Sequence, residues 1–179
     1  MRILLGIVIG LVAVLAITFV VGLLLPRGHT ASSRITLKSA PAQVWPVVRD
    51  LSSLVGTWSD LKSARRVPDA NGREVWEQSA GGFDMRLIVE EVTEPTRMLT
   101  RIDTPPGAAF GGTWTYQVEP AGPGTQVTIT ENGYVSNPIF RVMMAVMGVH
   151  RTADGYLKAL GKKLGEEVTA EHVGKSVSR

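Results

Sequence analysis

The chain has 179 residues, of which 44% are hydrophobic, and its formal net charge is +3 from 19 basic and 16 acidic side chains. This length leaves room for one globular domain beside a membrane segment, but not for two domains of ordinary size. The weak and scattered positive charge argues against a nucleic-acid-binding surface. Cysteine is absent, which excludes disulfides, thiolate metal sites and cysteine nucleophiles.

The N-terminus is an apolar run from Ile3 to Leu25 without a charged residue. At about 1.5 Å per residue, a helix of this length crosses the hydrocarbon core of a bilayer. A cleaved signal peptide is the main alternative, but its apolar region is usually about 7–15 residues long and ends at a small-residue cleavage site. We therefore predict a single-pass membrane protein anchored through residues 3–25. Basic residues on both sides give only a weak preference for a cytoplasmic domain.

The next part of the chain predicts strands and short helices. A polar linker over residues 26–33 leads into alternating residues over 34–38, which predict a first strand. Pro41 suits the first turn of a helix, and residues 54–61 predict a second short helix or a turn that carries Trp58. Alternating residues joined by short turns then predict an antiparallel sheet with one buried face. Its further strands are expected over residues 73–79, 83–89, 97–103, 113–119 and 126–135.

The segment from Asn137 to Leu164 has the clearest helical period of the soluble part. Its first half is apolar nearly all round, whereas its second half carries lysines on one side. This pattern predicts one long helix that the sheet grips at the first half and that is half-solvated at the second. Together the elements predict an α+β domain over residues 34–165. The polar tail over residues 166–179 is expected to be frayed.

Two stretches of the sequence resemble the SRPBCC superfamily of START-like helix-grip proteins. SAPAQVWPVVRDL, after the first predicted strand, resembles the opening of these domains. TITENGYVSNPIFRVMMAVMG, which leads into YLKALGKKLGEE, resembles the polyketide cyclase/dehydrase and lipid-transport branch. The similarity covers about residues 33–167. It implies a helix-grip fold, in which a curved antiparallel sheet wraps a long C-terminal helix and leaves an apolar cavity. It implies no universal catalytic residue.

Three polar residues are weak catalytic candidates in such a cavity, namely Glu131, His150 and Tyr116. If the strand alternation continues, Glu131 points inward and its carboxyl group can act as a general acid or base. Gly133 instead favours a bulge that turns Glu131 to solvent. The helical period explains His150 as a satisfied core residue; the alternative is a hydrogen bond to a ligand or a proton relay.

The other site candidates are apolar or aromatic residues on faces that are expected to turn inward. They predict either a simple core or the wall of a ligand pocket. The predicted ligand-binding residues are Trp58, Phe83, Met85, Leu87, Trp114, Tyr116, Met143, Met147 and His150. The sequence shows neither a cluster of metal ligands nor a phosphate loop, so no metal or cofactor is expected.

Three functions remain open from the sequence. The first is a membrane-anchored binding protein for a lipid or other apolar small molecule, and it ranks first because no catalytic motif appears. The second is a cyclase- or dehydratase-like enzyme acting in the same cavity, which requires two of the polar candidates to face one pocket. The third is a protein-interaction domain with a filled core and an exposed apolar patch.

Overall fold

A computed structural model describes residues 2–174 of the chain. Helices and strands segregate as expected for an α+β protein. In chain order the elements are α1 (Arg2–Leu24), β1 (Gly28–Leu37), α2 (Pro41–Arg49), β2 (Leu61–Ala70), β3 (Arg73–Ala80), β4 (Phe83–Thr93), β5 (Arg97–Ile102), β6 (Phe110–Ala121), β7 (Gly124–Val135), α3 (Pro138–Met147), α4 (Arg151–Lys163) and β8 (Glu171–His172).

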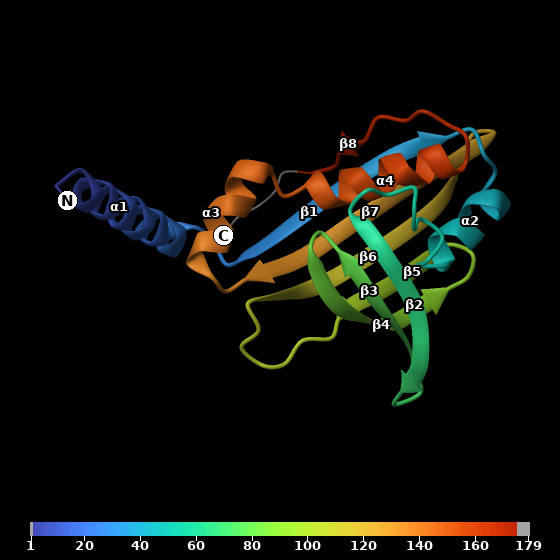
Figure 1. The fold of residues 1–179 in the computed structure, drawn as a ribbon. Helices are drawn as coiled ribbons and strands as arrows, with labels where there is room; N and C mark the ends of the chain where they lie inside the picture. Colours follow the sequence, from blue (N-terminus) through green and yellow to red (C-terminus); the bar gives the residue numbers. More distant parts are fainter. Residues whose placement is uncertain (1, 175–179) are drawn as a thin grey trace.

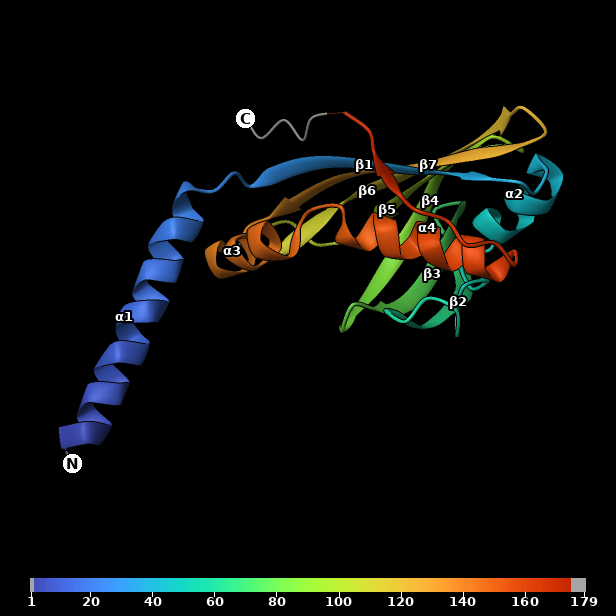
Figure 2. The same ribbon diagram turned by 90° about the horizontal axis from the view of Figure 1, so that it is seen from above.

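The strands form one antiparallel sheet in the order β2-β3-β4-β5-β6-β7-β1-β8. Strands that follow one another in sequence are neighbours, except that β1 lies between β7 and β8. The first strand pairs with β7 over its whole length, from Gly28 opposite Tyr134 to Leu37 opposite Thr125. The sheet is curved, with α4 along its concave face and α2 at one end (Figures 1 and 2). The expected helix-grip architecture is confirmed.

The hydrophobic core lies between α4 and the concave face of the sheet. Buried residues recur at every second position in the strands and at every third or fourth position in the helix, as the two periods require. The helix contributes Ala153, Leu157 and Leu160, which are fully buried. The strands contribute Ile35, Leu37, Val118, Val127 and Ile129.

The prediction of a single helix over residues 137–164 is wrong, because the chain breaks between α3 and α4. Asn137 caps α3 by accepting hydrogen bonds from the backbone N–H groups of Ile139 and Phe140, at 2.9 and 3.4 Å. The helix then ends at Gly148, whose φ of 87° is accessible mainly to glycine. The half of this segment that the sheet holds is also the opposite of the half that was expected. The sheet holds the amphipathic α4, whereas the more apolar α3 is largely exposed.

Two further boundaries differ from the sequence-based expectations at the edges of the sheet. Residues 28–33, expected as a linker, form the first half of β1. Residues 61–70, for which no element was predicted, form the edge strand β2. This strand lacks apolar alternation and carries Arg65 and Arg66, charges of the kind that keep an edge strand from pairing with other chains. Of the short helix or turn expected over residues 54–61, the turn is confirmed for residues 54–60, and Leu61 already belongs to β2.

The expectation of a frayed tail is wrong for residues 166–174; residues 175–179 lie outside the described part of the chain. The Glu166 carboxylate accepts hydrogen bonds from the backbone N–H groups of Lys38 and Ser39, at 2.7 and 2.9 Å. Val168 packs against the hydrophobic core. The tail then adds β8 to the free edge of β1.

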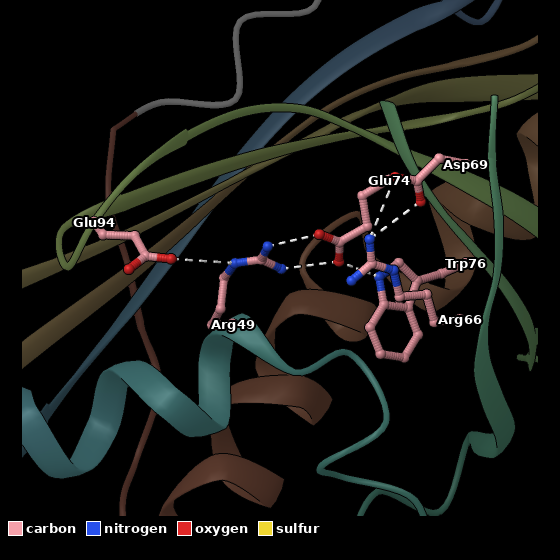
Figure 3. A network of polar contacts seen from close by, with 6 residues as sticks. All are labelled: Arg49, Arg66, Asp69, Glu74, Trp76 and Glu94. Atoms are coloured by element: carbon pink, nitrogen blue, oxygen red, sulfur yellow. Dashed lines mark hydrogen bonds and ion pairs between the residues drawn. The ribbon is translucent and has the colours of Figure 1, made fainter. Parts of the chain in front are cut away.

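An ion-pair network fixes α2 to the sheet (Figure 3). Arg49, at the end of α2, donates two hydrogen bonds to the Glu74 carboxylate of β3, at 2.9 and 2.6 Å. The Trp76 indole donates a third at 2.6 Å, and Glu94 lies 3.7 Å from the Arg49 guanidinium. The Arg49 hydrogen bonds outweigh the effect of burial and hold the pKa of Glu74 below its usual value. The same pairing raises the pKa of Arg49.

We predict that Glu74→Gln lowers the free energy of unfolding by about 1–3 kcal/mol, because a charge-assisted bidentate contact is lost. The pKa of Glu74 is lower in the folded state than in the unfolded state, so the contribution is fully present above about pH 4–5. It is lost as the pH falls through the folded pKa. Urea unfolding of the full chain in non-ionic micelles should therefore show a difference between wild type and variant at pH 7 that shrinks in acid.

Glu77→Gln is the matched control, because Glu77 lies on the same strand but pairs with Arg65, whose side chain is 74% exposed. An exposed ion pair contributes about 0–1 kcal/mol. Equal losses in the two variants would contradict the importance of the Arg49–Glu74 contact.

Candidate ligand-binding site

A cavity of about 300 Å³ lies between the concave face of the sheet, α3 and α4. Its wall is mainly apolar, with Met85 and Leu87 from β4 and Trp114 from β6. Trp58, from the turns before β2, lines it as well. Small-molecule sites in proteins usually measure about 300–1,000 Å³ and have apolar walls with a few polar groups. The cavity therefore has the size and chemistry of a site for a small apolar molecule.

All predicted ligand-binding residues except His150 line this cavity. Their contribution to binding remains a prediction. Several residues that were not predicted from the sequence also line the cavity: His29, Thr100, Phe110, Phe140, Met144 and Tyr156. The filled core of the third hypothesis is wrong, because the space between sheet and helices is not closed by side chains.

An aromatic cluster forms one end of the cavity. Tyr156 of α4 packs at 5.7 Å from Trp58, at 5.4 Å from Tyr116 and at 6.4 Å from Trp114, measured between ring centroids. Such inclined contacts are the preferred geometry of aromatic pairs. Burial raises the pKa of Tyr116 and Tyr156 well above the usual phenol value, with Glu131 adding to the effect on Tyr116. Both phenols are therefore neutral and can offer hydrogen bonds, but neither can serve as a base.

Glu131 faces the cavity, so the expected bulge is wrong. The strand β7 keeps continuous register through this residue, which lies opposite Ala31 of β1 and Trp114 of β6. The Glu131 Oε1 atom is 3.1 Å from His29 Nε2. Oε2 is buried and has no hydrogen-bond partner among the described residues. The mainly apolar wall of the cavity thus includes a buried carboxylate oxygen that is free to accept a hydrogen bond.

Gly133 makes room for this pair instead of marking a bulge. A Cβ atom on Gly133 would lie 2.7 Å from His29 Nε2 and 3.3 Å from Glu131 Oε1. His29 was difficult to predict as a cavity residue, because the inward positions that follow it in β1 are the small residues Ala31 and Ser33. Their small size hides the alternation that would have extended the first strand back to His29.

His150 lies outside the cavity, in the break before α4, and not on the face of a continuous helix. Its Nδ1 atom is 3.2 Å from the Ser33 hydroxyl, and its ring stacks on His172 at 3.8 Å. His172 in turn lies 3.0 Å from the Asp154 carboxylate. Burial lowers the pKa of His150, and the neighbouring His172 lowers it further. Among the described hydrogen bonds, the His150 ring contacts Ser33 and no carboxylate, so the alternative of a proton relay with a carboxylate is not formed.

A curved antiparallel sheet that grips a C-terminal helix beside an apolar cavity defines the START-like class of helix-grip domains. The chain belongs to the polyketide cyclase/dehydrase and lipid transport family, whose model matches residues 28–165. A comparison with curated proteins finds no match.

Solved structures with the same fold come from several bacteria. A START superfamily protein from Mycobacterium smegmatis has 16% identity and a TM-score of 0.60, over 76% of this chain and 97% of that one. The Zhui aromatase/cyclase from Streptomyces sp. R1128 has 15% identity and a TM-score of 0.62, over 76% and 94%. A conserved protein from Geobacillus kaustophilus has 18% identity and a TM-score of 0.58, over 80% and 99%. At these identities the similarity shows the fold alone.

We predict that Gly133→Ala displaces the His29 ring from Glu131 and destabilises the fold by about 1–3 kcal/mol, because a partly buried carboxylate loses its partner. Gly28→Ala is the matched control across the same strand pair, since its Cβ would lie at an ordinary 3.8 Å from the Gly133 carbonyl oxygen. Urea unfolding of the full chain in micelles measures both. Equal stability of the two variants would show that the His29–Glu131 contact contributes nothing.

Proposed function

We propose that the protein is a membrane-anchored binding protein for a lipid or other apolar small molecule held in the cavity. The observation that carries this proposal is the apolar cavity between sheet and helices. Membership of the family supports a domain that handles hydrophobic ligands, either by binding them or by cyclase-type chemistry.

The carboxyl group of Glu131 narrows the ligand chemistry that we propose. The unpartnered Oε2 of Glu131 accepts a hydrogen bond at little cost, because this oxygen is already desolvated. An apolar molecule with one hydroxyl group satisfies both parts of the site. Its body lies against Met85 and Leu87, and its hydroxyl donates to Glu131.

The proposed membrane anchor is α1. Residues 3–24 have a mean hydropathy of 3.0, and nearly all of them are exposed; Gly22, which packs against α3, is buried. A helix of this length and composition either spans a bilayer or acts as a signal sequence. We favour the anchor, because it holds the cavity near the bilayer, where apolar ligands are concentrated by partition.

We predict that residues 28–179, purified without detergent, bind N-phenyl-1-naphthylamine, a neutral apolar fluorophore, with one molecule per chain. Met85→Trp should weaken this binding at least tenfold, because the larger ring fills the cavity. Arg86→Trp is the matched control, since Arg86 is exposed and does not line the cavity. Fluorescence titration and native mass spectrometry measure binding. A wild-type domain that carries no lipid and takes up no fluorophore would contradict the proposal.

An enzymatic function is the second candidate, and the His29–Glu131 pair supports it. A carboxylate beside an imidazole at an apolar wall is a suitable general base for removing a proton from the carbon between two carbonyl groups. The neutral Tyr116 hydroxyl could then donate a hydrogen bond to the developing enolate. Cyclase-type chemistry needs a base and a donor of this kind, and the Zhui neighbour is by its name an aromatase/cyclase.

If the protein is such an enzyme, Glu131→Gln should lower the cyclisation rate of a soluble poly-β-ketone analogue about 10²–10⁴-fold. Fluorophore binding should change less than twofold, because the two side chains have the same shape. His150→Gln is the control outside the cavity and should leave the rate unchanged. Chromatography of the products measures turnover. A wild-type rate equal to the uncatalysed rate would rule out this candidate and leave the binding function.

A further inference from the structure

The outward face of α3 is apolar and carries no charge. Ile139, Met143, Val146 and Met147 are exposed, and the side chain of Val146 is 82% exposed. Arg141 is the only charged residue of this helix, and it is buried. Contiguous apolar surface of this kind usually marks a contact with a partner or a membrane.

The partner that contacts this exposed apolar face can be inferred from where α3 lies in the fold. The helix packs beside the C-terminal end of α1, as Figures 1 and 2 show. The contact is close, because a Cβ atom on Gly22 of α1 would collide with the carbonyl group of Pro138. The Arg141 guanidinium donates hydrogen bonds to the carbonyl oxygens of Gly22 and Leu25, at 2.9 and 3.2 Å. The uncharged face of α3 is thereby held at the level of the last turn of α1.

The rim of the cavity lies on the same side of the domain as the exposed face of α3. Its exposed apolar residues are Met143 and Met147 from α3 and Phe83 from the start of β4. Phe83 also packs edge-on against Phe110, with ring centroids 5.2 Å apart. The opening of the cavity is therefore bordered by α3, the helix whose Pro138 and Arg141 contact the end of α1.

We propose that α3 lies in the boundary between headgroups and acyl chains of the bilayer that α1 spans, and that the cavity opens directly onto lipid. This inference rests on the proposed anchor. An interfacial helix buries an apolar face in this boundary, and α3 offers such a face without having to bury a charge. A ligand then passes between bilayer and cavity without crossing water.

The test uses the full chain, which contains no cysteine of its own. Single cysteines are introduced as Val12→Cys in α1, Val146→Cys in α3, Phe83→Cys at the rim and Glu119→Cys in β6, near the turn farthest from α1 in Figure 1. Each variant carries the fluorophore NBD and is reconstituted in phosphatidylcholine vesicles. Quenching is measured with spin-labelled phosphatidylcholine and with iodide on both sides of the bilayer. Circular dichroism confirms that each variant is folded.

We expect lipid spin labels to quench positions 12, 146 and 83 at least threefold more strongly than position 119, and iodide to quench mainly position 119. If position 12 is quenched by lipid but 146 and 83 behave like 119, the anchor holds and this inference is wrong. If 146 or 83 is shielded from both quenchers, a second copy or another protein covers the face, which also overturns it. If position 12 itself is not quenched by lipid, the proposed anchor fails.

Discussion

The guanidinium of Arg141, in α3, joins this helix to the end of β7 and to the end of α1. It donates hydrogen bonds to the carbonyl oxygens of Val135 and Ser136 at the end of β7, and to those of Gly22 and Leu25 at the end of α1. The last carbonyl groups of a helix have no partner within the helix. A planar group with five N–H donors can satisfy several of them at once. Together with the close packing of Gly22 against Pro138, this buried side chain sets the direction in which the apolar N-terminal helix leaves the domain.

The shape of the cavity also depends on glycines, which have no side chain, at two positions of the sheet. Gly133 and Gly111 sit where a Cβ atom would collide with the rings of His29 and Tyr134. These rings can therefore lie flat against the sheet and extend the wall of the cavity. Glu131 becomes tolerable in an apolar wall because His29 occupies the space above Gly133. The carboxyl group of Glu131 and the space left by Gly133 therefore depend on each other.

The sequence predicted the parts of the fold in which periodicity and burial coincide. Strands such as β6 alternate cleanly, and the apolar helix face around Leu157 is buried as expected. The prediction from the sequence failed for elements whose burial does not follow from the periodicity of their residues. The strand β2 is a charged edge and shows no alternation. The apolar sequence of α3 wrongly predicts the gripped half of a helix, because high hydrophobicity does not distinguish a protein core from another apolar surrounding. Gly148 carried the signal for the helix end, but the surrounding period masked it.

The break at Gly148 also has a mechanical consequence. It divides the helical side of the cavity between two supports: α4 is held by the sheet, whereas α3 is held by the end of α1. Where α1 spans a bilayer, a change in its tilt shifts Met143 and Met147 relative to Tyr156. The space available to a ligand then depends on the tilt that the bilayer imposes on α1.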